Sequence, residues 1–464
     1  MDGSATVQDN QVLAGLTDLL QDAVTASDTY KSALHEKVSA VLAPEGKIDR
    51  TAFSANQHLA HGYGWVVTYI ETLRETANWA TRLEADGKLG EIDALLAQIL
   101  FSKYLADLVS GVPMNQGETI RPHELDALSE VDTLFKTPAV HTLITKGLTP
   151  NSMAAAAAHL PDSLGRATVE NTGEDETMSM IRDQFRRYTE DKIAPYAHEW
   201  HLKNDYIPMD VVNEMAELGV FGLTIPEEFG GLGMGKTAMC VVSEELSRGY
   251  IGTGSLGTRS EIAAELILIG GTDAQKEKYL PAIASGEILP TAVFTEPNTG
   301  SDLGALRTRA VKDGDTYKIT GNKTWITHPV RADLMTLLAR TNPDTNNFSG
   351  LSMFLAEKPR GSDEQPFPAE GMTGGEIEVL GYRGMKEYTL NFDDFKVKGE
   401  NLLGMEEGKG FKQLMETFES ARIQTAARAI GVAQSALDEG MKYAQDRKQF
   451  GKSLINFPRV SSMV

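Results

Sequence analysis

The sequence has few of the residues that disulfide bonds, a metal cluster or a membrane anchor would need. Its 464 residues contain a single cysteine, Cys240, which excludes an intrachain disulfide or a thiolate metal cluster. It lies in the apolar run AMCVVSEEL, so we expect it to pack in the core. No closely spaced histidine and carboxylate motif occurs, and we expect no metal. The longest uncharged apolar stretch, near GYGWVVTYI, is too short to cross a bilayer, and MDGSATVQDN lacks the apolar centre of a signal peptide. We therefore expect a soluble, cytoplasmic protein.

Positive charge is also scarce. The chain has 44 Lys and Arg residues against 65 Asp and Glu, a formal net charge of −21. Nucleic acid and anionic membranes need a basic face, so the balance argues against either as the main partner. With 41% hydrophobic and 23% charged residues, the composition is that of a globular protein with about three domains.

Changes in hydrophobic period predict an α+β fold with five segments. A helical period favours a bundle, a period of two favours strands, and loss of period indicates a linker. The predicted segments are a helical extension over 1–150, a linker over 151–176, a helical domain over 177–288, a β domain over 289–398, and a helical domain over 399–464.

Two stretches of the β domain suggest a polar site. In KTWITH, Trp325 and Thr327 are expected on one face of a strand, and Gly321-Asn322 reads as a two-residue hairpin turn. In TEPNTGSD, a strand leads into a tight Asn-Thr-Gly turn whose backbone amides and hydroxyls suit phosphates or a polar ring edge. The alternatives are plain cross-strand packing for the first stretch and a turn with a helix cap for the second.

The order of these stretches resembles the acyl-CoA dehydrogenase family. IPEEFGGLG, TEPNTGSD, KTWITH and RKQFGK follow one another on an α, β, α layout, and the resemblance runs from about residue 178 onward. Phe294 departs from the family pattern, which usually has an aliphatic residue before Thr-Glu, and we expect only local repacking there. The resemblance implies an acyl-CoA dehydrogenase-like fold and FAD-dependent oxidation of an acyl-CoA thioester, with electrons passing to an electron-transfer flavoprotein.

The same resemblance implies the cofactor site. Thr295 would form a hydrogen bond with the pyrimidine edge of the flavin, and Gly300 and Ser301 would lie at a flavin phosphate, with Ser301 bonded to it. Trp325 would pack on the flavin ring, and Thr327 would donate a hydrogen bond to N5. The RxxFG residues would reach the FAD of a neighbouring subunit, implying a homo-oligomer, either dimer or tetramer. These three residues are Arg447, Phe450 and Gly451.

The resemblance also suggests where the substrate binds. Glu419 and Arg422 match positions near CoA, with a surface ion pair as the alternative, because residues i and i+3 share a helix face. Stretches such as AEGMTGGEIEVLGYRGMKEY resemble members that act on a short branched acyl-CoA with a free terminal carboxylate. Arg259 would hold that carboxylate in a bidentate pair, with an intrahelical ion pair as the alternative.

The catalytic base is not assigned. The family's glutamate is expected beyond Val464, or directly before the residue that Arg422 matches, where this chain has Ala421. The last helical domain therefore looks incomplete, as in a shortened chain. Two alternatives stay open: a catalytically deficient protein that binds flavin or CoA esters, and a dehydrogenase of another short branched acyl-CoA. The helical extension over 1–150 has no assigned function. If it covers the surface that other family members use to form tetramers, this chain would form a dimer.

Overall fold

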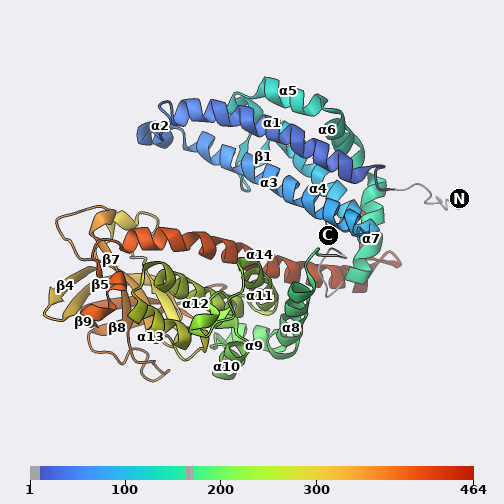
Figure 1. The fold of residues 1–464 in the computed structure, drawn as a ribbon. Helices are drawn as coiled ribbons and strands as arrows, with labels where there is room; N and C mark the ends of the chain where they lie inside the picture. Colours follow the sequence, from blue (N-terminus) through green and yellow to red (C-terminus); the bar gives the residue numbers. More distant parts are fainter. Residues whose placement is uncertain (1–10, 164–168, 170, 464) are drawn as a thin grey trace. The chain divides into compact units, whose positions relative to one another are not determined.

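A computed structural model describes residues 11–163, 169 and 171–463 of the chain. The chain forms two compact units, one of Met1–Glu174 with Leu437–Val464, and the other of Asp175–Ala436 (Figure 1). Each unit has its own hydrophobic core, with separate clusters of buried side chains.

The first unit is a bundle of helices. Its elements are α1 (Leu16–Leu42), α2 (Arg50–Ala55), α3 (Gln57–Ala85), α4 (Glu91–Ser110), β1 (Val112–Pro113), β2 (Thr119–Ile120), η1 (Pro122–Leu125), α5 (Leu128–Lys136), α6 (Pro138–Thr142), η2 (Leu143–Gly147), α7 (Pro150–Ser163), β10 (Lys448–Gln449), β11 (Lys452–Ser453), η9 (Leu454–Asn456) and α15 (Pro458–Ser461).

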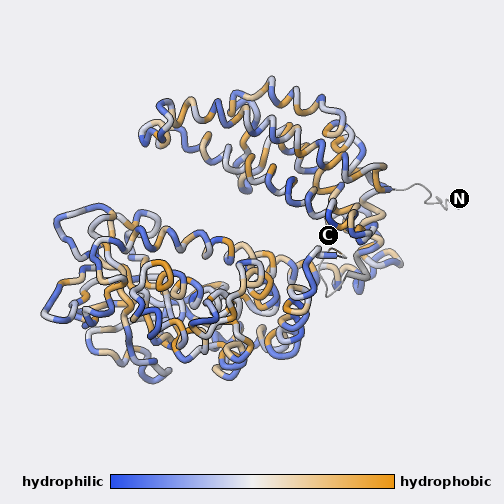
Figure 2. Tube along the Cα trace, viewed as in Figure 1, coloured by the Kyte–Doolittle hydropathy of each residue, from blue (hydrophilic) through white to orange (hydrophobic). Residues whose placement is uncertain are grey.

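Amphipathic packing holds this bundle together. Buried residues of α1 recur every three or four positions, as in Leu20, Val24 and Ser27, which places them on one helix face. They pack against a matching face of α3 and against Phe101 of α4. Figure 2 shows hydrophobic and hydrophilic stretches alternating along these helices.

The second unit begins with helices and continues as a sheet. Its helical elements are α8 (Glu176–Lys192), α9 (Ala194–Lys203), α10 (Met209–Glu217), η3 (Val220–Gly222), η4 (Glu227–Phe229), α11 (Lys236–Gly249), α12 (Ile251–Gly270), α13 (Asp273–Ala284), η5 (Leu303–Ala305), η6 (Phe348–Gly350), η7 (Gly399–Asn401), η8 (Leu403–Met405) and α14 (Gly410–Asp446), the last of which continues into the first unit.

The sheet of this unit has seven strands, gathered at one end of the unit in Figure 1. They run β3-β6-β4-β5-β9-β8, with β7 paired to β6, and the pairing is antiparallel except between β3 and β6 and between β4 and β6. The strands are β3 (Pro290–Val293), β4 (Arg309–Asp313), β5 (Thr316–Thr327), β6 (Leu334–Arg340), β7 (Leu351–Glu357), β8 (Met372–Ile377) and β9 (Glu387–Lys398).

Two local predictions from the sequence are wrong. Gly321-Asn322 is not a hairpin turn, because β5 runs straight through both residues and pairs with β9 on either side of a register shift. The hairpin lies between β4 and β5, where Gly314 has a φ of 61°. The segment predicted as a linker, 151–176, is helical over its first half, since α7 spans Pro150–Ser163 and its alanine run has the highest helix propensity. Residues 164–168 and 170 of that segment lie outside the described part.

The sequence missed the β1–β2 hairpin within VPMNQGETIRP and strand β8. Cys240 is half-buried on α11, and burial raises the pKa of its thiol. None of the helices among the described residues combines the length and apolar character needed to span a membrane.

Truncating Phe101 to alanine should cost the first unit about 3–5 kcal/mol of unfolding free energy, because its fully buried ring would leave a cavity. Val41→Ala is the matched control, since Val41 is 42% exposed and should change stability by less than about 0.5 kcal/mol. Urea denaturation followed by circular dichroism measures both. Equal losses of unfolding free energy in the two variants would show that the core between α1, α3 and α4 does not stabilise this unit.

Candidate active site

The segment TEPNTGSD forms a tight turn directly after β3. Glu296 and Thr299 exchange two backbone hydrogen bonds of 2.9 and 3.0 Å, so the turn is centred on Pro297 and Asn298 rather than on Asn-Thr-Gly. Pro297 suits this position because its ring presets φ. The turn leaves Gly300 and Ser301 exposed, with no heavy atom within 4 Å of a Cβ built on Gly300.

A buried ion pair joins this turn to strand β5. Lys323 is fully buried and its Nζ donates to Phe294 O at 2.8 Å and to Glu296 Oε1 at 3.3 Å. Glu296 also accepts from the backbone N–H groups of Arg307 and Thr308, at 2.8 and 2.7 Å. Burial lowers the pKa of Lys323 to about 8, against the attraction of Glu296. Burial opposes ionisation of Glu296, but Lys323 and the N–H donors keep the pKa of this carboxyl below its usual value.

The backbone of the two segments is also in direct contact. Thr324 N donates to Thr295 O at 2.9 Å, so Thr295 lies beside the strand that carries Trp325 and Thr327. The sequence prediction that these stretches share a site is consistent with this geometry. Phe294, the departure from the family pattern, packs its ring edge-on against Phe418 of α14, with centroids 6.2 Å apart.

Strand β5 is irregular where it would meet a ligand. Its register with β9 shifts between Lys323 and Ile326, and Trp325 and His328 have φ values of 57° and 62°. Such left-handed conformations cost roughly 1–3 kcal/mol each and cluster at functional sites. The bulge leaves Trp325 57% exposed while Thr327 is 6% exposed, so simple alternation along the strand does not describe their faces. The exposed indole and the open turn at Gly300 suit a flat, phosphate-bearing cofactor.

A second polar cluster lies on α12, α14 and the loop between β8 and β9. The Tyr382 hydroxyl accepts hydrogen bonds from Arg259 Nη2 at 3.2 Å and from Arg428 Nη1 at 3.0 Å, and it contacts the Ser255 hydroxyl. The Nε groups of both arginines are buried without a hydrogen-bond partner among the described residues. Two cations with unused donors therefore meet at one point inside the second unit.

The charges of this cluster act on Tyr382. Burial opposes ionisation of the phenol, but the guanidinium groups of Arg259 and Arg428 lower its pKa below the ordinary value. The intrahelical ion pair considered for Arg259 does not form in the described structure, because its polar contact is to Tyr382. The arrangement is suited to an anion with two or more oxygen acceptors.

The remaining predicted substrate and cofactor residues belong to α14 or to the first unit. Glu419 and Arg422 are exposed on α14, and among the described residues no ion pair joins them. The Arg422 guanidinium lies 5.9 Å from the centre of the Phe418 ring. Arg447, Phe450 and Gly451 belong to the first unit, where Phe450 is 91% exposed.

The sequence did not single out Tyr382, Arg428 or Glu387. Arg428 lies six residues after Arg422 on the helix already predicted, but nothing in its local pattern separates it from a solvated arginine. A lone tyrosine in a glycine-rich loop likewise carries no signal. Only the tertiary packing of α12, α14 and the loop between β8 and β9 brings Arg259, Arg428 and Tyr382 together.

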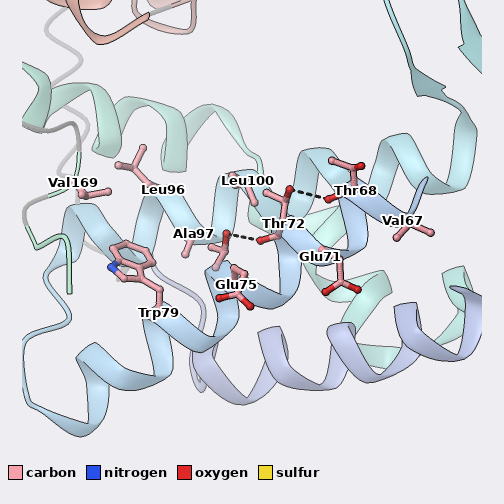
Figure 3. Close-up of a pocket in the computed structure, with 11 residues that line it drawn as sticks. Val67, Thr68, Glu71, Thr72, Glu75, Trp79, Leu96, Ala97, Leu100 and Val169 are labelled. Carbon is pink, nitrogen blue, oxygen red and sulfur yellow. Dashed lines mark hydrogen bonds between the residues drawn. The ribbon is translucent and has the colours of Figure 1, made fainter. Parts of the chain in front are cut away.

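A large cavity of the first unit does not have the character of a reaction site. It has a volume of about 740 Å³ and lies along α3 and α4 (Figure 3). The hydroxyls of Thr68, Thr72 and Thr76 each donate to the carbonyl four residues earlier. Glu71 pairs with Lys31 and Arg74. The lining residues are Val67, Thr68, Glu71, Thr72, Glu75, Thr76, Trp79, Leu96, Ala97, Leu100 and Val169.

Three family models match the chain in the order of its segments. The N-terminal, middle and C-terminal domains of acyl-CoA dehydrogenase match residues 175–287, 291–395 and 408–464. The chain belongs to the acyl-CoA dehydrogenase family.

Individual relatives extend this match. The chain is 59% identical to a (2S)-methylsuccinyl-CoA dehydrogenase of Cereibacter sphaeroides, over 99% of this chain and 82% of that protein. Butyryl-CoA dehydrogenase from Megasphaera elsdenii has a similar structure, with a TM-score of 0.58 and 32% identity over 63% of this chain and 74% of that one. A glutaryl-CoA dehydrogenase from Mycobacterium smegmatis in complex with FADH2 gives a TM-score of 0.55 and 26% identity over 62% and 70% of the two chains.

Replacing Lys323 by methionine should cost about 3–5 kcal/mol of unfolding free energy, because it leaves the Glu296 carboxylate buried without its cation. The double variant Lys323→Met/Glu296→Gln should recover part of that loss. Lys312→Met, at an exposed position of β4, is the control. Urea denaturation at neutral pH is the measurement, and a Lys323→Met effect as small as that of the control would rule out a structural role for the pair.

Proposed function

We propose that the chain catalyses the FAD-dependent α,β-dehydrogenation of (2S)-methylsuccinyl-CoA to mesaconyl-CoA, within the ethylmalonyl-CoA route. The observation that carries the proposal is the convergence of Arg259 and Arg428 on Tyr382, with unused donors on both guanidinium groups. An apolar fatty acyl chain cannot form hydrogen bonds with two guanidinium groups in this position, whereas a terminal carboxylate can. The identity to the Cereibacter sphaeroides enzyme supports this substrate.

The residues around β5 would hold FAD. The exposed Trp325 indole would lie against the ring system, with the Thr327 hydroxyl at N5 and Thr295 at the pyrimidine edge. Exposed Gly300 and Ser301 would approach a phosphate, as backbone amides and hydroxyls at an open turn can. When bound, FAD supplies the acceptor for the hydride that leaves the β carbon. The complex of the Mycobacterium smegmatis relative with FADH2 supports this cofactor.

The arginine cluster would orient the acyl group. Each guanidinium can donate to one oxygen of the terminal carboxylate, which fixes the far end of a short acyl chain. Fixing that end places the α and β carbons reproducibly, and orientation of this kind accounts for much of the rate in such reactions. Tyr382 would then share its hydroxyl between the two arginines and the bound carboxylate.

CoA binding, subunit assembly and electron transfer complete the proposed function. Glu419 and Arg422, exposed on α14, would lie near the CoA moiety. No described residue is assigned as the base that removes the α proton. Arg447, Phe450 and Gly451 would reach the FAD of a neighbouring subunit, so the working form would be a homo-oligomer. An electron-transfer flavoprotein in the cytoplasm would take up the electrons.

The first test is an absorbance spectrum of the purified, FAD-loaded chain during anaerobic titration. Methylsuccinyl-CoA should bleach the flavin band, because two electrons enter the cofactor, while butyryl-CoA should bleach it far less. Equal bleaching by both esters would reject the dicarboxylic substrate. A chain that binds no FAD would reject the proposed function.

The second test isolates the arginine cluster by binding. Arg428→Leu and Arg259→Leu should each weaken methylsuccinyl-CoA binding about ten- to hundredfold, the worth of a hydrogen bond to a charged group. Butyryl-CoA binding should change less than about threefold, because that ester has no carboxylate to lose. Isothermal titration calorimetry measures both dissociation constants.

The matched control for these variants is Lys412→Leu, which removes an exposed cation from the same helix as Arg428. Its dissociation constants for both esters should equal those of the unmodified chain. Loss of binding of the same size for methylsuccinyl-CoA and butyryl-CoA in the arginine variants would show that these residues support the fold and do not select the substrate.

A further inference from the structure

Glu387, at the start of β9, is a buried acid whose oxygens make no hydrogen bond of ordinary length and angle among the described residues. Its side chain is 3% exposed, and both carboxylate oxygens lack a partner in the part of the chain that the structure describes. A buried ion in this position would be costly, since several kcal/mol are lost when a carboxylate leaves water without compensation. An ionised Glu387 would therefore need a compensating charge, whereas a protonated Glu387 would need only a nearby acceptor.

The register of the sheet places Glu387 beside the Thr327 side chain. The two residues are direct cross-strand partners in the pairing of β5 with β9, and such partners have Cβ atoms about 5 Å apart on the same face. A glutamate side chain spans that distance to a threonine hydroxyl. On the other side, Glu387 faces Ile377 of β8, which offers no polar group.

The charged neighbours do not neutralise this acid. The charge of Arg259 on α12 favours ionisation of Glu387, but among the described residues the two side chains do not approach within the 4.0 Å of an ion pair. Arg259 Nη2 donates to the Tyr382 hydroxyl instead. Burial raises the pKa of the Glu387 carboxyl against the opposing effects of Thr327 and Arg259. The protonated acid is thus the form that the site favours.

His328, next to Thr327, is also buried and neutral. Both ring nitrogens lack a hydrogen-bond partner in the described structure, and the side chain is 2% exposed. Burial, together with nearby cations such as Arg331 and Arg360, lowers the pKa of His328 to about 3. His328 therefore brings no positive charge that would draw a proton away from Glu387.

The protonation state of Glu387 decides whether the Thr327 hydroxyl can donate its hydrogen to a ligand. A threonine hydroxyl has one hydrogen to donate, whereas a carboxylate can only accept. Beside an ionised Glu387, Thr327 would give its hydrogen to the carboxylate and face any other ligand as an acceptor. Beside a protonated Glu387, Thr327 can accept from the acid and keep its own hydrogen for a ligand.

We propose that Glu387 is a positioning residue that stays protonated and donates its hydrogen to the Thr327 hydroxyl, so that Thr327 donates to the flavin edge. The inference rests on the proposed function, because it takes Thr327 as the residue that meets the cofactor. Ionisation of Glu387 at high pH reverses the direction of this hydrogen bond.

The protonation state is tested first without any ligand. Infrared difference spectroscopy of the chain against Glu387→Gln should show the carbonyl band of a protonated acid at neutral pH, and Glu378→Gln, at an exposed position of the loop after β8, should not. Because the folded pKa is raised above the ordinary 4.5, the stability that this acid contributes is present below that value and is lost as pH rises. The urea midpoint of Glu387→Gln should therefore exceed that of the unmodified chain increasingly above pH 5, whereas Glu378→Gln should show no such trend.

The direction of the hydrogen bond is tested in the FAD-loaded chain. A glutamine amide still donates but cannot ionise, so Glu387→Gln should keep the flavin absorption spectrum and abolish its change at high pH. Glu387→Leu removes the donor and should lower kcat about tenfold, with little change in KM. In a Thr327→Val background, Glu387→Gln and Glu387→Leu should have no further effect on the spectrum.

The outcomes separate this inference from the proposed function. If FAD binds and methylsuccinyl-CoA bleaches it, but Glu387→Gln retains the pH dependence of the unmodified chain, only the role of Glu387 fails. An ionised Glu387 in the infrared spectrum at neutral pH also overturns it. Absence of FAD binding in the unmodified chain removes the proposed function and the inference together. A purely structural glutamate would affect the urea midpoint equally at every pH.

Discussion

The candidate site depends on the buried ion pair between Lys323 and Glu296. A fully buried lysine is stable only with a compensating partner, and here one ammonium group ties the turn after β3 to the middle of β5. Glu296 extends the connection to the backbone of residues 307 and 308. This pair thus sets the distance between the turn that would approach a phosphate and the strand that carries Trp325 and Thr327.

The same connection accounts for the irregular course of β5. Trp325 in this strand and His328 directly after the strand have left-handed backbone conformations, and strain of this kind persists only where the surroundings hold it. Lys323 anchors the strand on one side of the bulge, and pairing with β9 resumes at Ile326 on the other. The result is an exposed indole next to a buried hydroxyl, both held by rigid sheet.

The two polar clusters of the second unit complement each other. One offers an open turn, a flat aromatic surface and a buried acid; the other offers two guanidinium groups with unused donors. The first suits a flavin and the second a carboxylate. If they act as proposed, their presence in one unit would explain how a general dehydrogenation scaffold is specific for an acyl group with a charged end.

The sequence alone determined the family and the α+β order of segments. It also predicted a cofactor site around β5, because motifs such as TEPNTGSD and KTWITH lie in short, continuous stretches of chain. It further predicted Arg259 as a ligand of the substrate carboxylate, through the resemblance to the family. Only the tertiary structure showed Arg428, Tyr382 and Glu387, which come from α14, a loop and β9. It likewise replaced the turn expected at Gly321-Asn322 with continuous strand, since pairing with β9 outweighs local turn preference. Burial and cross-strand register are properties of the packed chain, and no local pattern contains them.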